Sequence, residues 1–217
     1  MTTTLRKRRL PYSREAARRH LLRADPVMRA IVRGVGPYEL APRGDVYRSL
    51  MRAVLYQQLA GAAASAIERR YLALYGGRQP EPDELLATSP QRLRSAGISR
   101  QKAGYLHSLA QHFADGKLND RRLRRASDDE VIEHVTQIKG VGRWTADMLL
   151  MFCLGRPDVL PVGDLGIQSA MQSAYRLRKR PDAKRMEQIA RPWRPYRSAA
   201  SWYLWRSFEI ITPELTL

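Results

Sequence analysis

Residues 138–146 read Ile-Lys-Gly-Val-Gly-Arg-Trp-Thr-Ala, so two glycines bracket a single apolar residue. Apolar residues recur at helical spacing before the stretch, at Val131 and Val135, and after it in Met148–Leu154. Glycine permits tight backbone conformations and close approach of a partner. The amides that follow open a helix, whose free N–H groups and dipole favour an anion. The stretch predicts a hairpin between two helices, although an ordinary αα-turn also favours glycine.

The rest of the chain is helical in pattern. A capping box at Ser127–Glu130 opens one helix, and Asp164 and Asp182 each precede another. Strand alternation and internal repeats are not evident, so the sequence predicts an all-α fold. Residues 1–12 are expected to form a basic arm, and 33–45 and 80–90 to form connections. Further helices are expected at 14–22, 46–75 with a break near Gly61, 99–113, 143–154 and 196–211.

Composition limits the class of protein. The 217 residues suit one or two compact domains. The formal charge of +17 favours a polyanionic partner, with nucleic acid ahead of an anionic membrane, although solubility or a genome rich in arginine codons would also produce it. No apolar run reaches the roughly 18 residues of a membrane span, and the N-terminus lacks the apolar region of a secretory signal. We therefore expect a cytoplasmic protein, associated with the nucleoid in a bacterium.

Metal and disulfide chemistry find little support in the sequence. Cys153 is the single cysteine and sits in an apolar run, so we expect it to be buried. One cysteine excludes an internal disulfide framework and a four-cysteine iron–sulfur cluster. The four histidines are scattered and lack metal-site spacing.

The hairpin string resembles the helix-hairpin-helix motif of the superfamily of base-excision DNA glycosylases, in particular its alkylation-repair branch, the 3-methyladenine DNA glycosylase II group. The segments Val54–Leu59, Leu160–Gln168 and Arg191–Ser198 resemble the same branch in the same order, so the likeness spans residues 45–210. It implies two helical subdomains with the active cleft between them. Residues 46–120 would form a bundle with a wedge loop, and 1–45 plus 121–217 the helix-hairpin-helix bundle.

Asp164 is the catalytic residue that the resemblance implies. It lies 22 residues beyond Gly142, where the family has an aspartate that opens a helix. There it would offset positive charge on the sugar as the N-glycosidic bond breaks, and orient or deprotonate water. Aspartate is also a favoured helix cap, and both roles can coexist. Trp144 stands where the lyase branch has its lysine, which implies a monofunctional glycosylase with water as the nucleophile. The missing cysteines agree, because many members of the lyase branch carry an iron–sulfur cluster.

The resemblance also implies a pocket for a base flipped out of the duplex. An aromatic box would bind a cationic alkylated base over its ring faces. Core packing is the alternative for such tryptophans. The expected lining residues are Trp144, Trp202, Tyr56, Trp205 and Met148, the last standing where some relatives have a tyrosine.

A wedge loop is expected to fill the gap that the flipped base leaves. The loop would consist of Gln57, Gln58 and Leu59, with Gln58 best matching the inserted residue. Two exposed glutamines on a helix are the alternative.

The expected partner is double-stranded DNA with damaged bases, bound by a monomer without a membrane role. No cofactor is expected to be required, but the carbonyls of Thr136, Ile138 and Val141 would hold Na⁺ or K⁺. Some residues of the basic clusters, such as 121–125 and 176–180, would meet phosphates, whereas most charge runs are only solvated faces. The hairpin residues expected to contact DNA are Lys139, Gly140, Val141, Gly142, Arg143 and Thr145.

Three alternatives remain open on the sequence. One is a bifunctional glycosylase and lyase acting on oxidised bases. Another is a helix-hairpin-helix DNA-binding protein without activity. The third is a basic membrane-surface protein, although no helix pairs a basic face with an aromatic face.

Overall fold

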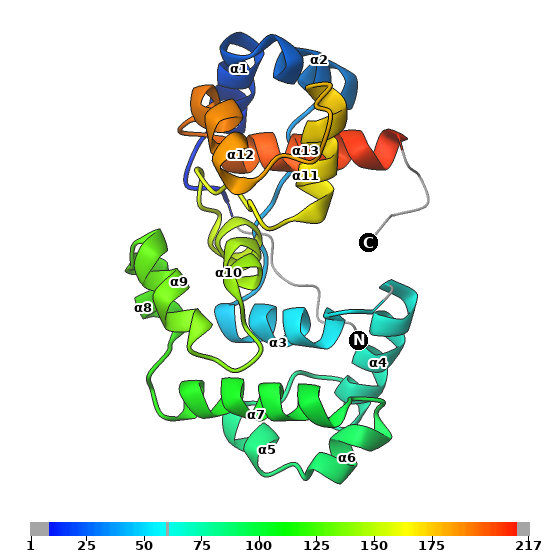
Figure 1. Cartoon of the computed structure of the whole chain (residues 1–217). Coiled ribbons are helices and arrows are strands. Elements are labelled where there is room, and N and C mark those ends of the chain that lie inside the picture. Colours follow the sequence, from blue (N-terminus) through cyan, green and yellow to red (C-terminus); the bar gives the residue numbers. More distant parts are fainter. Residues whose placement is uncertain (1–8, 60, 212–217) are drawn as a thin grey trace. The chain divides into compact units, whose positions relative to one another are not determined.

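The computed structural model describes residues 9–59 and 61–211, and within these ranges every regular element is a helix (Figure 1). The all-α prediction is confirmed for this part of the chain. Most of the basic arm expected at 1–12 lies outside the described residues. None of the described helices combines the length and the apolar character that a bilayer-spanning helix requires.

One compact unit comprises Arg43–Leu149, apart from residue 60. Its core is built around α3 and α7, which pack against each other and receive the shorter helices. Buried leucine and tyrosine side chains such as Leu50, Tyr71 and Leu106 fill this core. The helices are α3 (Val46–Tyr56), α4 (Gly61–Ala73), α5 (Pro82–Leu86), α6 (Pro90–Ser95), α7 (Arg100–Ala114), α8 (Asp120–Arg125), α9 (Asp128–Thr136) and α10 (Arg143–Leu149).

The second unit comprises residues 9–42 and 150–211. Here α13 packs against α2 and α11, and its side chains Tyr203 and Leu204 are fully buried. The helices are α1 (Arg14–Ala24), α2 (Pro26–Val35), the π-helix η1 (Leu150–Leu154), α11 (Leu165–Ala174), α12 (Ala183–Ala190), the 3₁₀-helix η2 (Arg191–Trp193) and α13 (Arg197–Ile211).

These units divide the chain differently from the expected boundary at residue 120. The segment 121–149, with the hairpin, belongs to the same unit as α3. The physical reason is packing, because α10 packs on both α9 and α3, and α8 packs on α3. Val131, Val135 and Ile138 are buried in this arrangement. The second unit is discontinuous in sequence.

Besides α5 and α6, which lie in and just after the expected connection at 80–90, two more helices were not expected from the sequence. The first, α2, begins with Pro26 at its first turn and is capped by Asp25, so part of the expected connection 33–45 is helical. The second, α8, contains the arginine cluster 121–125 and is capped by Asn119. With six residues and a single buried side chain, Leu123, α8 carries little periodicity, which is why the pattern missed it.

Candidate functional site

Asp164 lies at the N-terminus of α11, and its carboxylate caps that helix. The Oδ1 atom accepts hydrogen bonds from the backbone N–H of Ile167 at 2.8 Å and from the indole N–H of Trp205 at 2.9 Å. The residue is 8% exposed. Two donors on one oxygen fix the orientation of the carboxylate. The capping role that the sequence allowed is therefore present, and it leaves an oriented anion at a helix end.

The indole of Trp205, which donates to this carboxylate, also contacts another aromatic ring of the same unit. The rings of Phe152 and Trp205 lie 5.6 Å apart between centroids, and Phe152 is 40% exposed. Leu165, next to Asp164, is 63% exposed. A Cβ at Gly166 would lie 3.1 Å from the Asp164 carboxylate, so glycine leaves room for the Asp164–Trp205 pair.

The sequence did not single out Phe152 or Leu165. A signal for Phe152 exists, because it follows Trp144 by eight residues with Met148 midway, which is a helical spacing. Leu165 carries only its position after Asp164 as a signal.

Trp202, on the same helix as Trp205, has different neighbours. Its ring contacts Tyr38 and Tyr203 edge-on, with centroids 5.2 and 5.0 Å away. Both tyrosines are buried, so Trp202 packs onto an aromatic cluster of the core. Of these two tryptophans, Trp205 is the one hydrogen-bonded to Asp164.

The two glycine positions of the hairpin differ in whether the structure requires glycine there. Gly140 has a φ of +82°, and a Cβ there would overlap the ring of Tyr105 on α7. Only glycine fits that position. A Cβ at Gly142 would meet nothing within 4 Å. Packing within the chain therefore explains Gly140, whereas the space beside Gly142 is open to a partner.

The hairpin backbone leads directly into α10. The N–H of Val141 donates to the carbonyl of Ile138 at 3.0 Å, and the N–H of Ala146 donates to the carbonyl of Gly142 at 3.1 Å. The amides between these two bonds lie at the positive end of the helix dipole, where an anion is stabilised. The side chains of Val141 and Thr145 are each only 4% exposed. Both side chains are therefore buried, so a contact of Val141 or Thr145 with a surface partner would be made by the backbone.

Side chains of the hairpin helix differ in exposure. Lys139 is exposed, Trp144 is 43% exposed and Met148 is partly buried. Arg143 Nε lies 3.0 Å from the carboxylate of Asp147, which is 1% exposed. Burial raises the pKa of the Asp147 carboxyl, and the guanidinium of Arg143 opposes that rise.

The expected wedge loop follows the last residue of α3. Residues 57–59 form a turn rather than a helix, so the alternative of two helix glutamines is wrong. Gln58 is exposed and has a φ of +56°, a left-handed conformation that non-glycine residues seldom adopt. Gln57 points elsewhere, and its Nε2 donates to the carbonyl of Gly140 at 2.7 Å.

Tyr56, at the end of α3, is held by charged neighbours. Its hydroxyl donates to Glu68 at 2.6 Å and lies 3.1 Å from the hydroxyl of Ser65. The guanidinium of Arg52 lies 4.0 Å from the ring centroid of Tyr56. One ring face is therefore already occupied by a cation.

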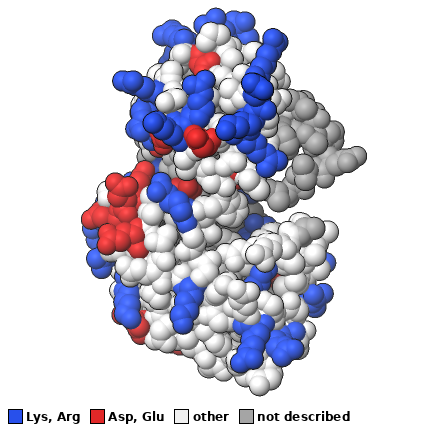
Figure 2. All heavy atoms as spheres, in the orientation of Figure 1, with Lys and Arg blue, Asp and Glu red and all other residues white. Residues whose placement is uncertain are grey.

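Charge is unevenly distributed over the surface (Figure 2). Residues 9–42 and 150–211 contain 18 Lys and Arg against 8 Asp and Glu. Acidic side chains gather instead over α9, which contains Asp128, Asp129, Glu130 and Glu133. A basic surface of this density attracts polyanions.

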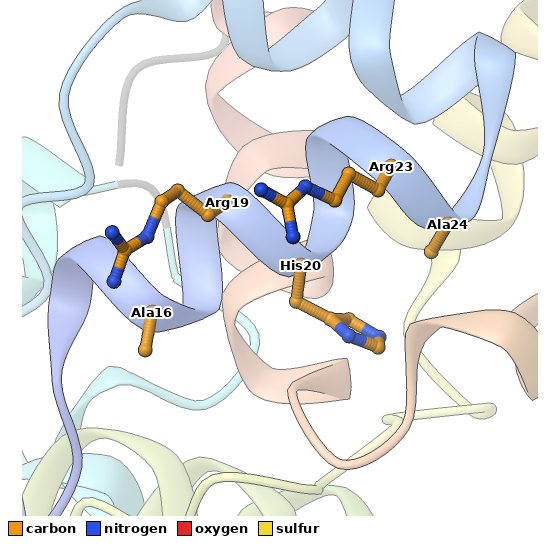
Figure 3. A pocket seen from close by; sticks show the side chains of 5 residues that line it. All are labelled: Ala16, Arg19, His20, Arg23 and Ala24. Atoms are coloured by element: carbon orange, nitrogen blue, oxygen red, sulfur yellow. The ribbon is translucent and has the colours of Figure 1, made fainter.

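An open hollow of about 460 Å³ runs along α1 (Figure 3). Arg19 and Arg23 project beside it, and a ring nitrogen of His20 lies 2.9 Å from the carbonyl of Pro192. No carboxylate lines the hollow, so it differs in chemistry from the surroundings of Asp164. Among the described residues, no group of three or more His, Cys, Asp and Glu side chains could hold a metal ion.

Comparison with known proteins gives the chain a family context. Residues 51–195 match the family model described as HhH-GPD superfamily base excision DNA repair protein. DNA-3-methyladenine glycosylase 1 of Schizosaccharomyces pombe is 36% identical over 196 residues, which cover 88% of this chain and 86% of that protein.

Two solved structures have the same fold. The S. pombe 3-methyladenine DNA glycosylase in complex with abasic DNA gives a TM-score of 0.80 at 36% identity, covering 88% of this chain and 96% of that chain. A DNA-3-methyladenine glycosidase from Bacillus halodurans gives a TM-score of 0.81 at 34% identity, covering 91% of both chains.

Proposed function

Because this chain belongs to the HhH-GPD superfamily of base excision DNA repair proteins, we propose that it excises alkylated bases from duplex DNA by hydrolysing the N-glycosidic bond. Trp144 stands at the position of the lyase lysine, so the activity is monofunctional and water is the nucleophile. Relatives at 36% and 34% identity named as 3-methyladenine glycosylases support the substrate class. The protein acts as a monomer on its DNA.

The observation that carries the proposal is the oriented carboxylate of Asp164. Hydrogen bonds from Ile167 and Trp205 hold its Oδ1 atom at the start of α11. As the glycosidic bond lengthens, positive charge develops on the sugar, and a fixed carboxylate stabilises that charge without reorganising. The same carboxylate orients or deprotonates the attacking water. An alkylated base with a positive charge leaves without a dedicated general acid.

Aromatic side chains supply the proposed recognition of the base. Within residues 9–42 and 150–211, Phe152 is 40% exposed and the ring of Trp205 lies against it. Ring faces of this kind attract a cation by roughly 0.5–2 kcal/mol per contact. A neutral base gains only stacking there, so the preference is for cationic alkylated bases. Tyr56 contributes less, because Arg52 already covers one face of its ring.

The hairpin is the proposed site for the DNA backbone. The amides after Gly142 favour a phosphate, and Lys139 adds an exposed positive charge. A monovalent cation on the carbonyls of Thr136, Ile138 and Val141 would polarise these amides further. The residues fit such an ion, because carbonyl oxygens are suitable ligands and that of Ile138 keeps a second lone pair beside its bond from Val141.

Base release is the direct test. Wild type and Asp164→Asn would be compared on methylated duplex DNA and on oligonucleotides with one 1,N6-ethenoadenine or hypoxanthine, with abasic sites cut by alkali. We expect release by wild type and a loss of about 100-fold or more in the variant, the effect of removing one transition-state charge partner. Strand cleavage without alkali, or trapping by borohydride, would instead indicate a lyase.

Binding without release would point to the inactive DNA-binding alternative. Wild type would then show tight, salt-sensitive binding to the duplex and no abasic sites on any substrate. Equal activity of Asp164→Asn and wild type would remove Asp164 from the mechanism while leaving the substrate class intact.

A further inference from the structure

The carboxamide of Gln57 connects two loops that are far apart in the sequence. It leaves the turn after α3 and donates to the carbonyl of Gly140 at 2.7 Å. Both residues belong to the unit Arg43–Leu149. The bond is a neutral hydrogen bond of ordinary length, worth about 0.5–1.5 kcal/mol net.

This bond completes the fixation of one peptide group in the hairpin. The peptide between Gly140 and Val141 has its N–H bonded to the carbonyl of Ile138 and its oxygen bonded to Gln57. Beneath it, the ring of Tyr105 fills the space where a side chain at Gly140 would lie. A peptide held at both ends cannot rotate, so the backbone that leads from it to the amides of Gly142 and Arg143 starts from a fixed orientation.

The same bond acts on the turn that contains Gln58. Gln57 has φ −53° and ψ 131° at the end of α3, and Gln58 follows with φ +56°. A left-handed conformation costs a non-glycine residue on the order of 1 kcal/mol and persists where its neighbours hold it. The anchored side chain of Gln57 and the bond from the Leu59 N–H to the Tyr56 carbonyl at 3.3 Å are such holds.

We propose that Gln57 is a positioning residue, a strut that couples the phosphate-binding hairpin to the gap-filling turn, while Gln58 alone enters the duplex. The inference rests on the proposed function for the identity of the partner, duplex DNA. It assigns the two adjacent glutamines different tasks, since the side chain of Gln57 is engaged by the hairpin and that of Gln58 is exposed. Loss of the strut would loosen the hairpin before any base is flipped.

Binding to an undamaged duplex separates the two roles. Such a duplex engages the hairpin through its phosphates without base excision, so the readout does not depend on catalysis. We expect Gln57→Met, which lacks the donor, to weaken this binding about three- to tenfold, the effect of one hydrogen bond. The matched variant Gln58→Met keeps the bond from Gln57 to Gly140, so it should weaken this binding less than Gln57→Met does, yet lose single-turnover base release.

A second pair controls for charge. Gln57→Glu and Gln58→Glu place the same negative charge on neighbouring residues, but only the first sets a carboxylate against the Gly140 carbonyl. The first should weaken binding more than the second. Equal losses of duplex affinity within either pair would overturn the proposal that Gln57 positions the hairpin. Because the readout is binding, this holds whether or not the protein releases bases.

Amide hydrogen exchange distinguishes a local loosening of the hairpin from a general loss of stability. In Gln57→Met we expect faster exchange of the Val141 amide, with the core amide of Leu106 on α7 as protected as in wild type. Faster exchange at both amides would indicate a merely structural role and would overturn the proposal. Unchanged exchange at Val141 would also overturn it, because the hairpin would then be rigid without Gln57.

Discussion

The indole N–H of Trp205 donates to Oδ1 of Asp164 at 2.9 Å, on the same oxygen that caps α11. The pair joins α13 to the start of α11, two helices that pack along each other. A tryptophan expected from the sequence as a pocket wall is thereby also a hydrogen-bond donor to the proposed catalytic carboxylate. Its ring still contacts Phe152.

Replacing Trp205 by phenylalanine removes this donor and keeps an aromatic ring. A hydrogen bond to a charged group contributes about 1.5–3 kcal/mol, so we expect single-turnover base release to fall about 10- to 100-fold. Affinity for an undamaged duplex should be unchanged. Trp202→Phe is the matched control and should lose less, because the neighbours of Trp202 are Tyr38 and Tyr203. Equal losses in both variants would show that the bond to Asp164 is unimportant.

Alanine substitutions at the two hairpin glycines should affect different properties, stability at Gly140 and duplex binding at Gly142. Gly140→Ala forces a side chain into the Tyr105 ring at a φ of +82°, so it should lower the free energy of unfolding by roughly 1–3 kcal/mol. Gly142→Ala adds a methyl group to open space and should leave the melting temperature unchanged. It should still weaken duplex binding, because the methyl group blocks close approach of a phosphate. Thermal unfolding and duplex titration, run on both variants, test the pair.

Much of the fold could be predicted because helix starts depend on interactions between residues that are close in sequence. Capping boxes and aspartate caps, as at Ser127 and Asp164, predict where helices begin. In each case the side chain accepts a hydrogen bond from a free backbone amide in the first turn of the helix, close by in sequence. The boundary between the units was harder. It depends on α10 packing against α3, a contact between helices distant in sequence that no local pattern encodes.

The candidate site divides in the same way. Asp164 and the hairpin glycines stand in motifs, so the sequence could single them out. The bonds from Trp205 to Asp164 and from Gln57 to Gly140 join positions 41 and 83 residues apart. Which of two neighbouring glutamines or tryptophans makes such a bond depends on its direction in space, which helical spacing leaves undetermined.

Lys139 is an exposed cation of the hairpin, and its contribution to duplex binding can be measured from the dependence of affinity on salt concentration. If it contacts one phosphate, Lys139→Met should reduce the slope of log affinity against log salt concentration by about 0.9. Arg94→Met removes an equally exposed charge on α6 and should leave the slope unchanged. Duplex binding titrated from low to high salt compares the two. A change of the same size in both variants would mean that net charge, rather than a contact of Lys139, sets the slope.

Asp147 links stability to pH through its burial in α10. Burial raises the pKa of its carboxyl above the ordinary value of 3.8, so the folded state holds the proton more tightly than the unfolded chain does. Stability that this proton provides is present below pH 3.8 and is lost as the pH rises through the raised pKa. In Asp147→Asn that loss should disappear, giving a flatter dependence of the free energy of unfolding on pH above 3.8. Arg143 loses its partner in the variant at little cost, because its side chain is 63% exposed. Urea unfolding at a series of pH values measures this, and parallel curves for variant and wild type would contradict the raised pKa.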